Sequence, residues 1–317
     1  MPSYLKLLHC SRSNLLLLCF GVCLRFNMVS FAADGAAQAP IRHSYLVLGS
    51  HTAIISEDGR TDWEYAGGSR DGFVLPNGNV LIAWADRVEE VTRAKQIVFS
   101  YKRSKENGEL GTTQRLYNGN TLVTELGARP RLLEVDREGK IVLDVPLQPE
   151  TSNQHMQTRM ARQLRNGNYL VPHLLAFAVK EYSPQGKVVR TFQTDLEEIG
   201  GRKAENWPFT AIRLDNGNTL VSLTHGNKVV EFNPLGKIVW KVGNENVGGR
   251  FNDPCGSQRL ASGNTVIGSH GVTKGVSMLE VTPELNVVWT SEHPLAGVHH
   301  FQILTTNGKP EPGMPMK

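Results

Sequence analysis

Short runs of alternating apolar and polar residues recur along most of the chain, and each run is bounded by turn signals. A period of two is typical of half-buried β-strands, and no stretch shows the 3.6-residue period of an amphipathic helix. The clearest element is L-x-N-G-N-x-L, in which Asn-Gly separates two apolar runs. Asn-Gly in this setting predicts a type I′ hairpin, because that turn needs a positive φ at both central residues. The pattern therefore predicts an all-β chain built from hairpins.

This hairpin element is repeated. Four copies are clear, a fifth is a variant and a sixth is one residue longer, and they begin at Leu75, Leu116, Leu164, Leu214, Leu260 and Leu304. A strand, a turn ending in Gly-Lys or its equivalent and a further strand follow the copies, as in Val230 to Val242. The unit is four strands in about 40 to 50 residues, which is typical of a β-propeller blade.

Each end of the chain carries part of one further unit. Tyr45 to Val47 and the strand–turn–strand element 54–65 have no hairpin before them, and the last copy has no partners after Gly308. Pairing the two ends completes a blade and removes the exposed edges of an open array. We therefore predict a six-bladed β-propeller of four-stranded blades over residues 44–309, with the last blade closed by N- and C-terminal strands and a tail at 310–317.

The N-terminal segment has a different composition. Lys6, His9 and Arg12 precede the apolar run 15–24, and small residues follow at 30–32. This arrangement predicts a signal peptide over 1–32 and a linker over 33–43. The apolar run is shorter than the roughly 20 residues that span a bilayer as a helix, and an uncleaved N-terminal anchor is the alternative. We expect a secreted or periplasmic protein.

Removal of the signal peptide changes the charge and the cysteine content. The net charge of +4 falls by three, to +1, when Lys6, Arg12 and Arg25 are lost. A nearly neutral chain gives no electrostatic case for binding nucleic acid or an anionic membrane. Cys255 is the only cysteine left, so no intramolecular disulfide can form. We expect a monomer in which Cys255 is buried, with an exposed reactive thiol as the alternative.

The two faces of such a ring are unequal. Because strands alternate in direction, the Asn-Gly and Gly-Lys turns emerge on one face, and the loops after the second and fourth strands emerge on the other. The second set is long and varied, for example 146–158, 193–207 and 243–254. Function usually resides on irregular loops carried by a rigid scaffold. We expect the site on this variable-loop face, where the inner strands begin and surround the central channel.

Histidines at the ends of second strands suggest a metal site. His51, His225 and His270 each follow Ser or Thr there, and the repeat places them in neighbouring blades. Asp253 precedes an inner strand close by in the alignment. Imidazoles and a carboxylate are suitable ligands for a divalent metal. The alternative is a set of independent loop histidines, because no tight ligand spacing is present.

A second group of polar and aromatic residues lies at or just before inner strands. Its members are Arg70, Asp71, His155, Arg159, Trp207 and Gln302. Arginine, histidine and tryptophan at a channel mouth suit an anionic or aromatic ligand. The alternative is that they fill a wet channel. Three further tryptophans, Trp63, Trp240 and Trp289, are expected to pack between blades.

No nucleophile elbow, phosphate-binding loop or paired catalytic carboxylates are present. Our leading hypothesis is an exported binding propeller that recognises a small polar or aromatic ligand, a glycan or a protein partner on its variable-loop face. Whether it is also an enzyme stays open at this point.

The repeat also resembles a known group. The composite D-x-x-G-K-I-V-W and L-P-N-G-N-x-L is similar to the propeller repeat of bacterial arylsulfotransferases and pyrroloquinoline-quinone-like propellers, and His299 to Gly308 resembles a His-His stretch of the former. This resemblance implies a sulfuryl-accepting histidine at the channel, either His299 or His300, supported by His225 and Arg70. The alternative functions are therefore sulfuryl transfer or metal-assisted hydrolysis by the histidine cluster. Quinone-dependent dehydrogenases differ in having eight blades and a disulfide between neighbouring cysteines.

Overall fold

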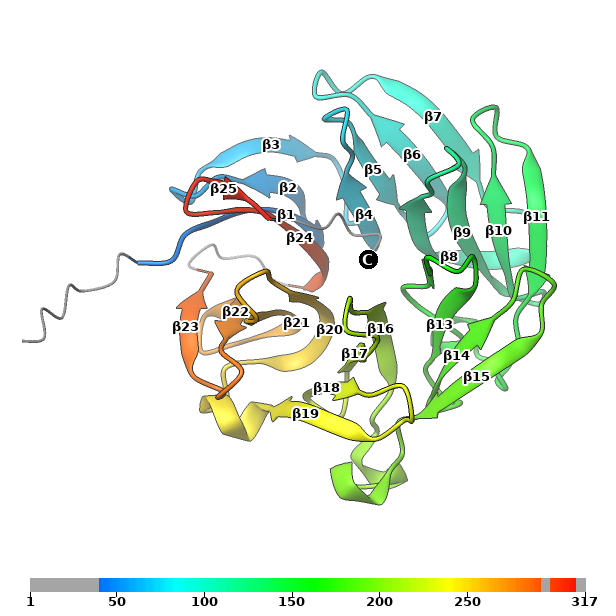
Figure 1. Cartoon of the computed structure of the whole chain (residues 1–317). Helices are drawn as coiled ribbons and strands as arrows, with labels where there is room; N and C mark the ends of the chain where they lie inside the picture. Colours follow the sequence, from blue (N-terminus) through cyan, green and yellow to red (C-terminus); the bar gives the residue numbers. More distant parts are fainter. Residues whose placement is uncertain (1–39, 292–296, 312–317) are drawn as a thin grey trace, which may run out of the picture. The chain divides into compact units, whose positions relative to one another are not determined.

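Six antiparallel sheets surround a common axis, as Figure 1 shows for the computed structural model. The structure describes residues 40–291 and 297–311. The expected signal peptide at 1–32 and most of the linker lie outside the described residues. Within the described part of the chain, no helix has the length and apolar character needed to cross a membrane. The prediction of an all-β, six-bladed propeller is confirmed.

Five blades have four strands each, and we name each blade by its inner strand. The β4 blade has β4 (Asp71–Val74), β5 (Val80–Ala83), β6 (Arg87–Val91) and β7 (Ile97–Lys102), and the β8 blade has β8 (Asn107–Arg115), β9 (Thr121–Gly127), β10 (Arg131–Val135) and β11 (Ile141–Pro146). The β12 blade has β12 (Arg162–Gln163), β13 (Tyr169–His173), β14 (Ala178–Tyr182) and β15 (Val188–Gln193), and the β16 blade has β16 (Pro208–Arg213), β17 (Thr219–Leu223), β18 (Lys228–Phe232) and β19 (Ile238–Gly243). The β20 blade has β20 (Asn252–Arg259), β21 (Thr265–Thr273), β22 (Val276–Val281) and β23 (Val287–Thr290).

The sixth blade, which we call the closing blade, joins the two ends of the described chain. Its strand order is β25-β24-β1-β2-β3, with bounds β1 (His43–Gly49), β2 (Thr52–Ile55), β3 (Thr61–Tyr65), β24 (Val298–Thr306) and β25 (Lys309–Pro310). β1 and β24 are antiparallel, with Tyr45 opposite Ile303 and Leu48 opposite His300. The predicted closure is confirmed, and the two-residue strand β25 adds a fifth strand that the sequence did not predict.

The Asn-Gly turns differ from the expected type I′. In the first copy the Gly78 amide donates to the Leu75 carbonyl (2.8 Å) and the Leu75 amide to the Asn79 carbonyl (2.8 Å). Gly78 has φ +83°, but Asn77 is not among the described residues with positive φ. The geometry is therefore a type I turn followed by a left-handed glycine, which gives a three-residue hairpin loop. Pro76 favours this geometry because its ring fixes φ near the value that the second turn position needs.

A clamp centred on a glutamate links five of these hairpins to the next blade. The second Asn of the motif in the β16 blade, Asn218, donates to Glu231 on β18 (2.5 Å), and Arg259 of the β20 blade donates to the other oxygen of the same carboxylate (2.7 Å). The equivalent glutamates of the other blades also accept from the motif asparagine. They are Glu90, Glu134, Glu181 and Glu280. The hairpin element thus fixes the turn and the spacing between blades together.

Apolar clusters between adjacent blades form the core. The three outer tryptophans contribute to this packing, as predicted. The Trp63 indole donates to the Arg93 carbonyl of the β4 blade (3.1 Å), and the Trp240 indole donates to the Pro283 carbonyl of the β20 blade (3.0 Å). Trp289 packs against the core of the closing blade.

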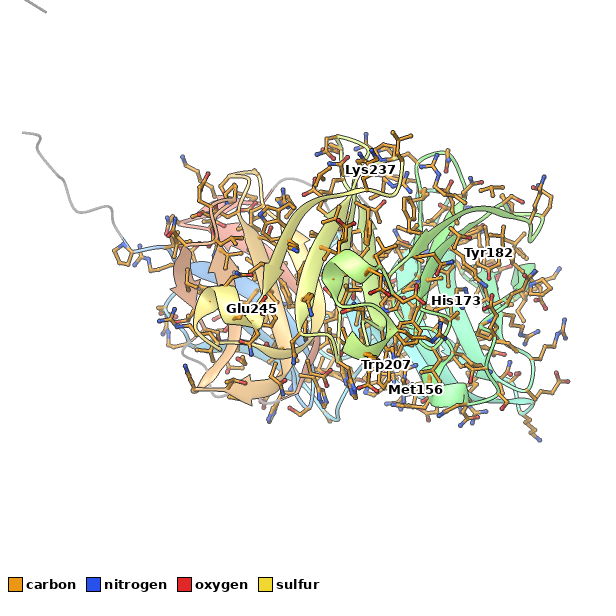
Figure 2. The ribbon with its side chains drawn as sticks, turned by 90° about the horizontal axis from the view of Figure 1, so that it is seen from below. Met156, His173, Tyr182, Trp207, Lys237 and Glu245 are labelled. Atoms are coloured by element: carbon orange, nitrogen blue, oxygen red, sulfur yellow. The ribbon has the colours of Figure 1, made fainter. Side chains whose placement is uncertain are left out.

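The two faces of the ring are arranged as the sequence predicts. Figure 2 shows Lys237, in the turn between β18 and β19, at one edge of the ring, and Met156 and Trp207 at the opposite edge. The loops that carry Met156 and Trp207 precede the inner strands β12 and β16. The variable-loop face is therefore the face on which the inner strands begin.

Candidate functional site at the mouth of the ring axis

We call the end of the ring axis at which the inner strands begin the mouth. Five residues from five blades form what we term the mouth cluster: Arg70, Glu109, Arg159, Phe209 and His299. Four of them lie five residues before the leucine of their hairpin motif, and Glu109 lies seven residues before. Equivalent positions of the repeat therefore lie at the same level along the ring axis in the different blades.

Two arginines of the mouth cluster share a single carboxylate. Glu109 on β8 forms an ion pair with Arg70 and lies 3.8 Å from Arg159. The Glu109 and Arg159 side chains are buried, with exposed fractions of 8% and 5%, whereas 20% of the Arg70 side chain is exposed. His155, in an exposed 3-10 turn, places its Nδ1 3.2 Å from Glu109. The two guanidinium groups with one carboxylate leave one excess positive charge.

Electrostatics keep Glu109 and Arg159 ionised. Burial alone would raise the pKa of Glu109, but the charges of Arg159 and Arg70 outweigh it and hold that pKa below its usual value. Burial lowers the pKa of Arg159 to about 10, which leaves the guanidinium charged at neutral pH. Its Nη1 donates to the Thr158 carbonyl (2.8 Å) and its Nη2 to the His155 carbonyl. Arg159 is therefore a positioned cation that has lost most of its hydration.

His299 lies in a stack of parallel rings. Its imidazole is 4.9 Å from the His270 ring with an interplanar angle of 10°, and 6.1 Å from the Phe209 ring with an angle of 19°. The Arg159 guanidinium carbon lies over the Phe209 ring, 5.8 Å from the ring centroid. Stacked planar groups beside a cation offer a surface for a planar ligand.

The protonation state of His299 follows from its surroundings. Nδ1 is 3.3 Å from the Ser69 carbonyl, which can only accept, so Nδ1 carries the proton. Burial, with the nearby His270, Arg159 and Arg70, lowers the pKa of His299 to about 4. The ring is therefore neutral at physiological pH, and its Nε2 has a free lone pair for a ligand or a reaction.

Below the mouth cluster, a buried ion pair connects non-adjacent blades. Arg162 on β12 donates to both oxygens of Asp71 on β4 (2.8 and 2.9 Å), across the intervening β8 blade. Thr112 and the Thr113 amide of β8 donate to the same carboxylate (2.5 and 3.0 Å). His300 on β24 lies 3.7 Å from Asp71. We term Asp71, Thr112, Arg162 and His300 the axial network.

The structure brings some of the predicted ligand-binding residues together and separates others. Arg70, Arg159 and His155 meet at Glu109. Asp71 is fully buried in the axial network instead of facing the mouth. Gln302 accepts from the Val74 amide (2.8 Å) and joins the closing blade to β4.

Trp207 is stacked on His225, with ring centroids 4.0 Å apart. His225 also pairs with Glu205 at 3.3 Å. His270 stacks on His299 and has its Nδ1 3.8 Å from Asp253. Among residues 40–291 and 297–311, no three His, Cys, Asp or Glu side chains are close enough together to hold a metal ion. The predicted metal ligands His51, His225, His270 and Asp253 therefore do not share one coordination sphere.

Cys255, also at the start of an inner strand, is 2% exposed, and burial raises the pKa of its thiol. It is therefore a buried thiol, as the sequence analysis preferred.

Sequence reasoning missed Glu109, Phe209, Thr112 and Arg162. A signal for the first two was present, because Glu109 has the same offset from its hairpin leucine as Trp207 and Phe209 has the same offset as Arg70. Thr112 likewise has the same offset as Asp71. No comparable signal indicated Arg162, because its long side chain reaches past a whole blade to find its partner.

Comparisons with known proteins agree with this fold. A family model described as Mal s 1 allergenic protein-like matches residues 52–270. No curated protein sequence matches the chain. A protein of unknown function from Bacteroides caccae has a similar structure, with a TM-score of 0.71 and 22% identity over 82% of this chain and 98% of that one.

Two further solved structures are similar at lower identity. A catalytically inactive virginiamycin B lyase from Staphylococcus aureus, solved with quinupristin, has a TM-score of 0.58 and 13% identity over 83% of this chain and 92% of that one. The WD40 propeller domain of Doa1 has a TM-score of 0.55 and 10% identity over 81% of this chain and 80% of that one. At these identities the likeness concerns the fold.

Proposed function

The chain belongs to the Mal s 1 allergenic protein-like family, and on this premise we propose that it is a binding propeller for a small planar anion, held at the mouth of the ring axis. The observation that supports this proposal is the sharing of Glu109 by Arg70 and Arg159 beside the stacked ring of His299. The excess positive charge favours a carboxylate, sulfate or phosphate group, because guanidinium pairs with such groups in a bidentate geometry. The similar fold of a lyase solved with quinupristin is consistent with a small ligand.

Calorimetry with matched probes tests this proposal. We expect benzoate to bind and benzyl alcohol, its neutral counterpart, not to bind. Arg70→Gln should weaken benzoate binding by roughly tenfold or more, because a charge-assisted hydrogen bond contributes about 1.5–3 kcal/mol. Arg165→Gln, on the opposite face and paired with exposed Asp215 at 3.2 Å, is the matched control and should bind like the wild type. Equal affinity for benzoate and benzyl alcohol would contradict the proposal.

Sulfuryl transfer is a second candidate function, favoured by the state of His299. His299 is a neutral imidazole whose Nδ1 is held by Ser69, which leaves Nε2 as a nucleophile. Arg70 and Arg159 lie close enough to lower the pKa of His299, so their positive charges also act on other charged groups at this position. In this reaction Nε2 forms a bond to sulfur as the bond between sulfur and the aryl oxygen breaks, which releases the aryl oxide. The oxygen of a phenol then bonds to sulfur as the N–S bond breaks, and the phenol proton passes to solvent water.

An assay of sulfuryl transfer from 4-nitrophenyl sulfate to phenol tests this candidate. Loss of 4-nitrophenolate release in His299→Ala, with release retained in Arg165→Gln, would favour the enzyme. No release by the wild type would exclude this donor and leave the binding function. His300→Ala completes the comparison, since the resemblance gave either histidine as the nucleophile.

Export is a further part of the proposed function, on the strength of the expected signal peptide at 1–32. N-terminal sequencing of the protein recovered outside the cytoplasm should give a mature chain that begins near residue 33. An intact N-terminus in a cytoplasmic fraction would contradict export.

A further inference from the structure

His300 is a buried side chain with both of its polar atoms unsatisfied. It is 5% exposed, and neither Nδ1 nor Nε2 has a hydrogen-bond partner within the part of the chain that the structure describes. No other side chain in that part leaves two buried polar atoms without partners. An unmade hydrogen bond at a buried group costs about 1–3 kcal/mol. A missing partner that lies outside the protein is therefore the simplest explanation of this site.

The axial network cannot provide that partner. Asp71 lies 3.7 Å from Nε2 of His300, too far for a hydrogen bond. Its Oδ1 already accepts from the Gly72 amide (3.0 Å) and from Arg162 (2.9 Å). Its Oδ2 accepts from Thr112, Thr113 and Arg162. A carboxylate has about four lone-pair sites, so Asp71 is saturated.

Two phenylalanine rings and the charge of Arg162 also act on His300. Phe73 meets the imidazole edge to face at 5.1 Å, and the ring of Phe301 is 6.3 Å away. Burial, with the charge of Arg162, outweighs the opposing charge of Asp71 and lowers the pKa of His300 to about 4, so the ring is neutral with one donor and one acceptor. An anion would meet the carboxylate of Asp71, and a cation would meet the guanidinium of Arg162. A neutral group that both donates and accepts fits these surroundings.

We propose that His300 marks a second subsite, one residue beyond His299 on β24, which holds a neutral hydroxyl group. In the complex this hydroxyl belongs to the ligand and supplies the partner that the two His300 nitrogens lack. This inference rests on the proposed function, because the same ligand places its anionic group at Arg70 and Arg159. The ligand class is therefore a hydroxylated aromatic or planar acid.

Binding of benzoate and of 2-, 3- and 4-hydroxybenzoate, measured by calorimetry, tests the subsite. We expect at least one isomer to bind the wild type about tenfold more tightly than benzoate, since satisfying one buried group is worth roughly that factor. His300→Phe, which keeps the ring shape and removes both nitrogens, should abolish the preference, measured as the ratio of hydroxybenzoate to benzoate affinity within the same variant. His300→Gln, which offers a donor and an acceptor, should keep part of it.

His173→Phe is the matched control. His173 is also buried and neutral, with a pKa lowered to about 3 mainly by burial, but its Nε2 already pairs with the Tyr182 hydroxyl (3.0 Å) away from the axis. This variant should lose stability and retain the hydroxybenzoate preference. Absence of a preferred isomer, or a preference that persists in His300→Phe, would overturn the subsite and leave His300 with water alone. Benzoate binding itself reports on the anion site, so failure of that site is recognised separately.

Discussion

At the scale of single residues, burial acts on the acidic and basic groups of the ring axis with opposite results. Asp71 stays ionised because the Arg162 charge outweighs the desolvation that would raise its pKa. At His299 and His300 the opposing groups, the Ser69 carbonyl and the Asp71 carboxylate, do not outweigh burial, which lowers the pKa of each ring to about 4 and leaves both neutral. The mouth therefore combines the fixed positive charge of the arginines with uncharged imidazoles. The arginines attract anions, and the imidazoles bind no proton at neutral pH.

The neutral histidines predict how stability depends on pH. Between pH 6.5 and about 4, the unfolded state binds a proton at His300 that the folded state does not bind, so stability falls as pH falls through this window. Each such group adds a slope of about 1.4 kcal/mol per pH unit. We expect His300→Phe to unfold with a shallower pH dependence than the wild type by about this amount, measured by urea denaturation from pH 4.5 to 6.5. Parallel curves for the two proteins would show that His300 is protonated in the folded state.

The buried ion pair of the axial network predicts a large loss of stability. Arg162→Met leaves the Asp71 carboxylate without its charged partner, and breaking a buried pair typically costs about 3–5 kcal/mol. Arg165→Met, which breaks the exposed pair with Asp215, is the control and should cost less than about 1 kcal/mol. The free energy of unfolding from chemical denaturation measures both. Similar values for the two variants would mean that water reaches the axial network.

At the scale of elements, the clamp around Glu231 predicts that the hairpin motif stabilises more than its own turn. Glu231→Ala removes the acceptor of both Asn218 and Arg259. We expect a loss of about 2 kcal/mol or more, because Arg259 is then left without its carboxylate at the blade boundary. Glu205→Ala, at an exposed loop position, is the control. Glu231→Gln keeps an acceptor for one partner and should lie between the two in thermal denaturation.

The repeat made the elements predictable, and the exceptions have identifiable causes. Asn-Gly correctly indicated hairpins, but each loop has three residues instead of two, so that only the glycine takes a positive φ, +83° at Gly78 and +89° at Gly119. The extra strand β25 was not predicted because a proline such as Pro310 usually indicates the end of a strand. Pro310 is tolerated there since the strand lies at a sheet edge, where a missing amide donor costs little.

The site was less predictable than the elements. Arg70, Arg159 and His299 were found because repeat alignment and residue chemistry pointed to the same strand starts. Glu109 was missed although it has the same offset from its hairpin leucine as Trp207, because an acidic residue at that position shows its role only once its two arginine partners are known. Which side chains pair with each other depends on three-dimensional packing. The separation of a residue from its hairpin leucine along the chain does not determine it.

At the scale of the whole molecule, closure of the ring predicts a cooperative loss of structure. A chain lacking residues 44–65 has no β1, β2 or β3, so β24 loses its sheet and the β20 and β4 blades lose a neighbour. We expect this chain to lose its cooperative thermal transition in circular dichroism and calorimetry. A chain that ends at Gly308 lacks only β25 and the tail and should still unfold cooperatively. A stable five-bladed product of the first deletion would contradict closure as the source of stability.

The pairing of β1 with β24 also determines when the ring can close during synthesis of the chain. His43 and Thr306, whose side chains meet in the closing blade, are separated by 263 residues along the chain. At a synthesis rate of about 5–20 residues per second, roughly 13 to 50 seconds pass between their emergence from the ribosome. During that time the first three strands present an open edge that other growing chains can pair with. The nascent protein is therefore most vulnerable to aggregation just before its last strand is made, and a chaperone that shields the N-terminal edge would raise its yield.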